Sequence, residues 1–371
     1  MRNLLIFHSA LAPYRVDFFN DLALKFNLTV IFLSRNVRNQ NFDENKLFSG
    51  ANFNYYFLDK KIVIKDRDLN FGYWPYISKF KPDIVIGGEY GLPTLMPLLY
   101  RIVFNKKFKL YTICDDSIQI AESCGGARKL FRDFLAPRLD GIILVNEKVS
   151  NWYNSKFNLK NPPIVFPIIR DEVKYRESVG KSLNFSKKYL KEYNLERKIN
   201  LLFVGRLAKV KNISALMKCF DQIANNDISL IIVGEGPERD ELYKLKESLR
   251  NKDLINFVGR FEGEELMGWY NCSDIFILPS TYEPFGAVVN EALLSGCYVL
   301  CSKYAGATSL IDKSNGYIVD TINENEFKSA LLKLIKKVHH KLPEDLDGIR
   351  PSKMNVYYKD CMSLLVERIN M

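Results

Sequence analysis

Histidine is scarce in this chain, and its scarcity limits the chemistry that the protein can perform. The 371 residues contain only His8, His339 and His340. A catalytic metal centre that needs several imidazole ligands is therefore nearly excluded, and we expect no metal and no cofactor. The seven cysteines are odd in number and include no Cys-x-x-Cys pair, which argues against a disulfide framework or a zinc ribbon. We interpret them as reduced, mostly buried thiols of a cytoplasmic protein.

Long apolar runs are also absent. The nearest candidate for a membrane span, Ile84–Phe104, contains Glu89, Arg101, two prolines and several glycines. The N-terminus has four consecutive apolar residues before His8, which is too short for a secretory signal and typical of a first strand. With 47% hydrophobic and 26% charged residues, the composition is that of a globular protein, and the length predicts two domains.

Positive charge is in excess and unevenly distributed. The net charge is +10, with a surplus of +8 in residues 1–180 and +2 in residues 181–371. An anionic membrane surface, a lipid pyrophosphate or a nucleic acid would suit the first half, and a merely soluble basic surface would suit it as well. No nucleic-acid-binding motif accompanies the charge, so we do not expect a nucleic acid partner.

Short apolar strands alternate with amphipathic helices in both halves of the chain. This alternation predicts an α/β protein with two parallel sheets, each covered by helices. The rhythm breaks at residues 161–198, which begin with Asn161-Pro162-Pro163 and become rich in charged residues. The predicted boundaries are residues 1–168, a linker at 169–198, a second domain at 199–349 and a returning helix at 350–371. The predicted strands are Leu4–His8, Leu28–Leu33, Ile84–Ile86, Lys109–Ile113, Gly141–Val145, Ile199–Val204, Ser229–Val233, Ile255–Val258, Ile275–Leu278, Tyr298–Ser302 and Gly316–Val319.

Polar residues gather where the predicted strands end. Ligands of parallel α/β sheets bind beyond the carboxyl ends of the strands, so two such edges facing each other would form a site between domains. The first half places His8, Tyr14, Arg15, Glu89, Asp115 and Asp116 at strand ends. The second half places there Gly205, Arg206, Lys211, Gly234, Glu235, Gly236, Pro237, Arg260, Phe261 and the loop Pro279–Gly286.

The densest of these clusters follows Leu278. Glu283 lies in the loop, and Phe285-Gly286-Ala287 is expected to begin a helix that Gly296 ends. The start of a helix presents unpaired amides that suit a phosphate. Glu291 would lie on the face of that helix nearest the loop, where a carboxylate can accept hydrogen bonds from a diol such as ribose. Arg206 and Lys211 would together neutralise a diphosphate without a metal ion.

Five motifs in order over residues 200–312 resemble the signature of the family-4 (group 1) retaining glycosyltransferases. The most specific is Glu-Pro-Phe-Gly-x-x-x-x-Glu-Ala, which begins at Glu283. The N-terminal half is similar to the family more loosely, through Ala12–Arg15. The resemblance implies the GT-B fold, in which two Rossmann-like domains face each other across a cleft. The other motifs are Gly205-Arg206-Leu207 with Lys211-Asn212, Gly234-Glu235-Gly236-Pro237, Val258-Gly259-Arg260 and Ser273–Ser280.

The resemblance also implies roles for the matching residues. Arg206 and Lys211 would bind the donor diphosphate and stabilise it as the leaving group, Glu283 would contact hydroxyls of the donor sugar, and Glu291 would hold the ribose. Transfer would retain the anomeric configuration. The remaining donor-binding candidates are the backbone near Pro284, Phe285, Gly286, Ala287 and Val288 and, around the base, Gly205, Glu235, Gly236, Pro237, Arg260 and Phe261.

The chain departs from the family pattern on the acceptor side. Many members have a Gly-Gly turn after the first strand, where this chain has His8-Ser9-Ala10, and a histidine where it has Cys114-Asp115-Asp116. Asp115 or Asp116 would replace that histidine, or one of them would simply cap the next helix. His8 has two possible roles, a buried structural one and a catalytic one. Tyr14, Arg15 and Glu89 complete the acceptor-side candidates.

Several other motifs predict a function less specifically. Asp66-Arg67-Asp68 and Asp345-Leu346-Asp347 match a D-x-D metal motif that is short enough to arise by chance. The segment Ala127–Ala136 predicts a basic helix packed on the sheet with a solvated basic face. The alternative is a surface that touches anionic lipid, which the aromatic run Phe71–Trp74 would support.

These observations predict a metal-independent, retaining enzyme that uses a UDP- or GDP-linked sugar. The expected acceptor is a lipid-linked or growing glycan of a surface polysaccharide such as capsule, O-antigen or lipopolysaccharide. In that case the protein would be cytoplasmic, at the inner face of the membrane. The alternatives are a small soluble acceptor, or a nucleotide-sugar-binding or epimerase protein without transfer activity.

Overall fold

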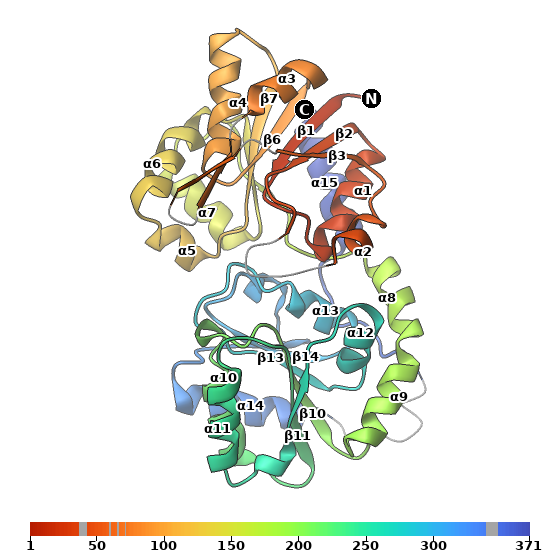
Figure 1. Ribbon diagram of the computed structural model, residues 1–371. Helices are drawn as coiled ribbons and strands as arrows, with labels where there is room; N and C mark the ends of the chain where they lie inside the picture. The colour runs from red at the N-terminus through yellow and green to blue at the C-terminus, as the bar shows by residue number, and fades with distance from the viewer. Residues whose placement is uncertain (37–42, 59–60, 65–66, 71, 339–347) are drawn as a thin grey trace. The chain divides into compact units, whose positions relative to one another are not determined.

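The computed structural model describes residues 1–36, 43–58, 61–64, 67–70, 72–338 and 348–371. The chain divides into two compact units (Figure 1). Unit 1 comprises Met1–Arg170 and Tyr358–Met371, and unit 2 comprises Asp171–Tyr357. None of the helices in these ranges combines the length and the apolar character that crossing a membrane requires.

Unit 1 is built on a parallel sheet of seven strands in the order β3-β2-β1-β6-β7-β8-β9. Strand β1 pairs with both β2 and β6. Successive strands are added on one side of β1 and then on the other, so the switch point of this sheet lies between β1 and β6. The strands are β1 (Asn3–His8), β2 (Asn27–Phe32), β3 (Asn54–Phe57), β6 (Ile84–Gly88), β7 (Lys109–Cys114), β8 (Gly141–Leu144) and β9 (Ile164–Val165), with a separate antiparallel pair β4 (Lys61–Ile64) and β5 (Arg67–Asn70).

Helices cover this sheet on both faces, as the continuous burial of its central strands requires. Within unit 1, Figure 1 shows α1 and α15 on one side of the sheet and α4 and α6 on the other. The helices are α1 (Val16–Ala23), α2 (Glu44–Phe48), α3 (Tyr73–Phe80), α4 (Leu92–Val103), α5 (Ile118–Ser123), α6 (Gly126–Leu135), α7 (Glu147–Lys156) and α15 (Tyr358–Asn370).

Unit 2 repeats the scheme with a parallel sheet of six strands in the order β12-β11-β10-β13-β14-β15. Its switch point lies between β10 and β13, both of which are fully buried. The strands are β10 (Ile199–Val204), β11 (Ile228–Val233), β12 (Ile255–Gly259), β13 (Ile275–Leu278), β14 (Tyr298–Ser302) and β15 (Gly316–Val319). The helices are α8 (Glu172–Lys181), α9 (Leu183–Glu192), α10 (Ile213–Ile223), α11 (Arg239–Ser248), α12 (Gly263–Asn271), α13 (Val288–Leu294) and α14 (Glu324–Lys337).

All eleven predicted strands exist, and each unit has its own apolar core around its sheet. The strands β3, β4, β5 and β9 were not predicted. They are only two to four residues long, and β3 has two exposed tyrosines that hide the alternation of a strand.

Residues 171–198, expected as part of a linker, are largely helical and belong to unit 2. Their many charges lie on the outer side, while Tyr189 on α9 stacks on Trp269 of α12 with ring centroids 4.1 Å apart. Gly268 allows this approach, because a Cβ there would lie 2.8 Å from the Cβ of Phe185. The unit boundary therefore lies between Arg170 and Asp171.

The C-terminal helix α15 completes unit 1. It packs against β9 and α1, and the ring of Tyr358 lies 6.0 Å from that of Phe166. At its far end, Arg2 Nη1 donates a hydrogen bond of 2.6 Å to the carbonyl oxygen of Asn370. Figure 1 accordingly shows the two chain ends close together.

Candidate functional site

Three loops at the carboxyl edge of the unit 2 sheet pack tightly on one another. The amide of Leu207 donates to the carbonyl oxygen of Glu235 at 3.0 Å, and the amide of Gly234 donates to that of Gly259 at 2.8 Å. A Cβ at Gly234 would lie 1.9 Å from the carbonyl oxygen of Gly205. The glycines of the Gly-Glu-Gly-Pro motif thus permit close approach of backbones, and the loops after β10, β11 and β12 form one surface.

Arg206 follows β10 on this surface. Its side chain is exposed, and within the described ranges it has no hydrogen bond or ion pair. An uncompensated guanidinium beside the switch point of a parallel sheet suits an anionic ligand.

Lys211 and Glu283 form an ion pair beside Arg206. Lys211 ends the 3-10 helix Lys209–Lys211 after β10, and Glu283 lies in the loop after β13. The two side chains are 20% and 12% exposed, and Ser280 Oγ also donates to Glu283 Oε2 at 3.3 Å. Lys211, predicted to be a cation available to a phosphate, is therefore neutralised by Glu283 in this structure.

The loop after Glu283 leads into α13 through a left-handed glycine. Gly286 has φ of 96°, and a Cβ there would lie 2.7 Å from Leu278 Cδ2. The helix begins at Val288, slightly later than predicted, and the left-handed Gly296 follows its C-terminal end at Leu294. In the described part of the chain, the amides of Gly286, Ala287 and Val288 have no backbone acceptor.

Glu291 is partly exposed on the first turns of α13. The hydroxyl of Tyr270, on α12, donates to Glu291 Oε2 at 3.2 Å. Burial and the adjacent Glu291 raise the pKa of Tyr270, so its hydroxyl stays a donor at neutral pH. Tyr270 therefore orients the carboxylate, and no sequence motif pointed to this partner.

The residues proposed to border the base differ in exposure: Glu235, Pro237 and Arg260 are exposed, whereas Phe261 is partly buried. Phe261 packs on Trp269 with ring centroids 5.7 Å apart, inside the aromatic cluster of α9 and α12. Arg260 forms an ion pair with Glu262, and Glu235 pairs with Arg239 at 3.3 Å. Pro237 and Pro284 are exposed at the loop surface.

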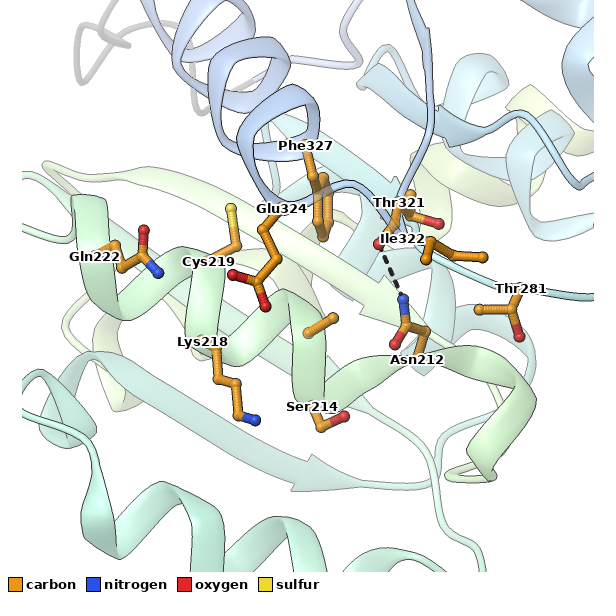
Figure 2. A pocket seen from close by; sticks show the side chains of 11 residues that line it. Asn212, Ser214, Lys218, Cys219, Gln222, Thr281, Thr321, Ile322, Glu324 and Phe327 are labelled. Atoms are coloured by element: carbon orange, nitrogen blue, oxygen red, sulfur yellow. Dashed lines mark hydrogen bonds between the residues drawn. The ribbon is translucent and has the colours of Figure 1, made fainter.

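A cavity of about 430 Å³ adjoins the Lys211–Glu283 pair, and the sequence analysis did not anticipate it. Asn212 follows Lys211 directly, and its side-chain amide donates to the carbonyl oxygen of Thr321 at 3.2 Å. Figure 2 shows side chains of α10 on one side and Glu324 and Phe327 of α14 on the other. The lining comes from separate segments, namely Asn212, Ser214, Ala215, Lys218, Cys219, Gln222, Thr281, Thr321, Ile322, Glu324 and Phe327.

The carboxyl edge of the unit 1 sheet carries a second group of charges. Arg15 is 2% exposed, and its Nη2 contacts both oxygens of Asp115, at 2.7 and 2.9 Å. The preceding Tyr14 is partly exposed. His8 lies beside this pair with Nδ1 2.9 Å from the carbonyl oxygen of Ala10. Burial and the Arg15 guanidinium lower the pKa of His8 to about 4, so the ring is neutral, which supports the structural role.

Glu89 and Asp116 share a partner that the sequence analysis did not include among the site residues. Arg128 on α6 forms an ion pair with Glu89, and its Nη2 lies 2.8 Å from Asp116 Oδ1. Asp116 is 4% exposed, whereas Glu89 is a partly exposed residue with φ of 63°, an unusual conformation for a side chain of its size. Loss of hydration together with the carboxylates of Asp116 and Asp115 raises the pKa of Glu89 to about 7, against the opposing effect of Arg128.

Neither aspartate caps the following helix, so that alternative is wrong. Ser117 is the N-cap of α5, and its hydroxyl accepts from the amide of Ile120 at 3.4 Å. Asp115 and Asp116 instead pair with arginines. Ligand atoms of Glu89, Cys114 and Asp116 lie within 4.8 Å of one another, but the guanidinium of Arg128 already contacts both carboxylates.

The remaining sequence motifs have structural explanations or lie outside the described residues. Tyr73 is 1% exposed and Trp74 donates to the carbonyl oxygen of Met96, so these two aromatic residues pack inside unit 1, whereas Phe71 of the same run lies outside the described residues. Asp66, Asp345–Asp347, His339 and His340 fall outside the described ranges. All seven cysteines lie within them, and none forms a disulfide.

The comparisons with known sequences agree on one family. Residues 186–347 match the family model described as "Glycosyl transferases group 1". The amylovoran biosynthesis glycosyltransferase AmsD of Erwinia amylovora is 24% identical over 309 residues, which cover 82% of this chain and 84% of that protein. The N-acetylgalactosamine-N,N'-diacetylbacillosaminyl-diphospho-undecaprenol 4-alpha-N-acetylgalactosaminyltransferase of Campylobacter jejuni is 30% identical over 185 residues, covering 49% of this chain and 50% of that protein. For most of the curated relatives, the match spans half or less of their own length.

Solved structures show the same fold. HepE of Anabaena in complex with UDP superposes with a TM-score of 0.69 at 16% identity, covering 99% of this chain and 97% of that one. Sucrose-phosphate synthase from Thermosynechococcus elongatus superposes with a TM-score of 0.65 at 15% identity, covering 100% and 94%. The two parallel sheets of units 1 and 2 are those of the GT-B fold. Residues 186–347 thus resemble the group 1 glycosyl transferases in sequence, and both units resemble GT-B enzymes in fold.

Proposed function

We propose that the protein is a retaining glycosyltransferase that moves a sugar from a nucleotide diphosphate sugar to a lipid-linked or growing polysaccharide acceptor, without a metal ion. The donor binds to unit 2. The observation that carries this proposal is the exposed Arg206, which has no partner in the described part of the chain and, like the Lys211 that pairs with Glu283, follows β10 where the order of the unit 2 sheet reverses. The UDP complex of HepE supports the choice of donor class.

The chemistry of the donor explains why cations are needed there. Breaking the bond between the anomeric carbon and the diphosphate leaves negative charge on the departing oxygen. A guanidinium that contacts that oxygen stabilises its charge, and one such contact is worth about 10²–10³ in rate. Arg206 supplies it directly, and Lys211 contributes once the diphosphate competes with Glu283 for its ammonium group. The free amides of Gly286–Val288 add donors for the phosphate or the sugar.

The acceptor side of the proposal rests on unit 1. Glu89 and Asp115 present partly exposed carboxylates at the ends of β6 and β7, with the buried Asp116 beside them, and carboxylates accept hydrogen bonds from sugar hydroxyls. The names of two relatives support the acceptor class, since one belongs to amylovoran biosynthesis and the other names a diphospho-undecaprenol. Retention of the anomeric configuration follows from the resemblance of the Glu283–Ala292 motif, and proton NMR of the product would test it.

The donor site is tested by thermal unfolding in EDTA. We would compare UDP, GDP and a panel of their sugars on the full chain and on Arg206→Ala. The expected result is a rise in Tm with one nucleotide family, lost in Arg206→Ala. Stabilisation that survives in the variant would place the diphosphate elsewhere, and stabilisation that is absent in EDTA but present in a parallel series with Mg²⁺ would refute metal independence.

Transfer itself needs a separate assay. The donor identified by stabilisation would be incubated with a membrane lipid extract and with small soluble sugars. Radiolabel that moves into the lipid fraction supports the proposal. Label found only in a soluble product would favour the small-acceptor alternative, and conversion of the donor without transfer would favour an epimerase.

A further inference from the structure

Five large apolar side chains of unit 1 are exposed on two neighbouring helices. At the C-terminal end of α4, Ile102 is 63%, Val103 62% and Phe104 47% exposed. On α6, Leu130 is 71% and Phe134 42% exposed. Leu130 and Phe134 are four residues apart and therefore lie on the same face of their helix. We call these five residues the apolar patch.

Several contacts connect the two helices that carry the apolar patch. Helices α4 and α6 pack against each other. Arg101, next to Ile102, donates from Nη2 to the carbonyl oxygen of Arg138 at 3.1 Å. Arg138 in turn lies over the ring of Phe134, with its guanidinium carbon 4.1 Å from the ring centroid. These contacts bring the C-terminal end of α4 close to the end of α6, and Figure 1 shows the two helices on the same side of unit 1.

The basic side chains of α6 do not form the solvated face that the sequence predicted. Arg132 is 3% exposed and donates to the carbonyl oxygen of Ala121 at 2.6 Å. Arg128 points to Glu89 and Asp116. With these two cations turned inward, the outer face of α6 is left to Leu130, Phe134 and Lys129, so its exposed surface is more apolar than its composition suggests.

Cations nevertheless border the apolar patch. Lys106 and Lys107 directly follow Phe104 and Asn105, are exposed, and have no carboxylate partner in the described ranges. Arg138 is exposed beside Phe134. The nearby carboxylates are already paired, Asp133 with Lys129 at 2.7 Å and Asp140 with Arg101. The rim of the apolar patch is therefore positively charged.

We propose that the apolar patch and its cationic rim dock unit 1 onto an anionic lipid bilayer. The apolar side chains would enter the boundary between headgroups and acyl chains, and the rim would contact anionic headgroups. A second copy of this chain fits less well, because a two-fold contact through the same face would bring Lys106, Lys107 and Arg138 of both copies together. The purpose of the contact rests on the proposed function, because a lipid-linked acceptor is presented at a membrane.

The test is flotation of the full chain with vesicles in 0.1 M salt. One set is phosphatidylcholine, and the other contains 30% phosphatidylglycerol. We expect binding to the second set and its loss in 0.5 M salt. Replacing Ile102 and Leu130 together by Asn should weaken binding at least tenfold, and Lys106→Gln with Lys107→Gln by about fivefold for each charge. Leu24→Ser is the matched control, since Leu24 is 69% exposed after α1, on the other side of the unit 1 sheet.

Several results would overturn the proposal. These are failure of the full chain to float, equal binding to both vesicle types, equal binding by the patch variants and Leu24→Ser, or a dimer in ultracentrifugation that the patch variants abolish. Circular dichroism and Tm establish that each variant is folded. The donor-dependent rise in Tm is measured on the same preparations. A change in vesicle binding with an unchanged donor-dependent rise in Tm bears only on the membrane proposal. A missing donor-dependent rise in Tm bears only on the proposed function.

Discussion

Replacing Glu283 by Gln is expected to separate the binding of a nucleotide diphosphate from sugar transfer. At present Glu283 neutralises Lys211, with the two side chains only 12% and 20% exposed. A unit charge about 8 Å from a phosphate, at an effective dielectric constant of about 20, contributes about 2 kcal/mol. Partial exposure to solvent reduces this to about 1 kcal/mol. Removing the negative charge should therefore tighten UDP or GDP binding about fivefold, while the lost contact to the donor sugar lowers kcat by about 10²-fold.

Isothermal titration with the free nucleotide measures the first effect, and radiolabel transfer measures the second. Lys211→Ala is the companion variant and should weaken nucleotide binding, because it removes the cation and leaves Glu283 unpaired. Glu247→Gln is the control, since Glu247 pairs with Lys252 at 2.8 Å on the surface of unit 2 and should change neither quantity. If Glu283→Gln weakens nucleotide binding as much as Lys211→Ala does, the electrostatic reasoning is wrong.

Three further predictions concern single positions. Arg206→Ala should lower kcat/KM for the donor by about 10²–10³. Its Tm should change little, because the Arg206 side chain is exposed and unpaired in the described part of the chain. A loss of kcat/KM below tenfold in steady-state kinetics would contradict its role. Gly234→Ala should destabilise unit 2 by about 2 kcal/mol or more in urea unfolding, since its Cβ would lie 1.9 Å from the carbonyl oxygen of Gly205. Gly348→Ala, also in unit 2 but with no atom within 4 Å of the added Cβ, should be neutral. The pKa of Glu89 is about 7 in the folded protein, above the ordinary value of 4.5. The stability that Glu89 contributes is therefore complete below about pH 4.5 and is lost as the pH rises through 7. The Tm of the wild type should fall relative to that of Glu89→Gln between pH 5 and 8, and parallel Tm curves would refute the shift.

The sequence predicted the sheets and the edges on which the candidate groups lie, because both signals are local. A buried parallel strand is a short continuous apolar run, and the residue that follows it lies at the carboxyl edge whatever the rest of the fold does. Arg206 after β10, Glu89 after β6 and Glu283 after β13 could all be placed by this rule. The left-handed Gly286 and Gly296 around α13 were visible for the same reason.

What the sequence did not predict depends on contacts between distant residues. Lys211 and Glu283 are 72 residues apart, and no local pattern shows that one neutralises the other. Arg128 read as one cation of a basic helix, although it reaches across to Glu89 and Asp116. Likewise, the charge density of α8 and α9 concealed Tyr189, whose stacking on Trp269 makes these helices part of unit 2. In each case the deciding partner lies on another element.

The return of α15 to unit 1 has a consequence for how the protein is made. The apolar rings of Phe18 and Phe166, 5.0 Å apart, are joined by Tyr358 only after the whole of unit 2 has been synthesised. At about 5–20 residues per second, translation from residue 170 to residue 358 takes about 10–40 s. During that time unit 2 is free to fold, whereas unit 1 waits with a surface uncovered on β9 and α1. The nascent chain is therefore most exposed to aggregation and to chaperones in its earliest residues, and it matures from the middle outward.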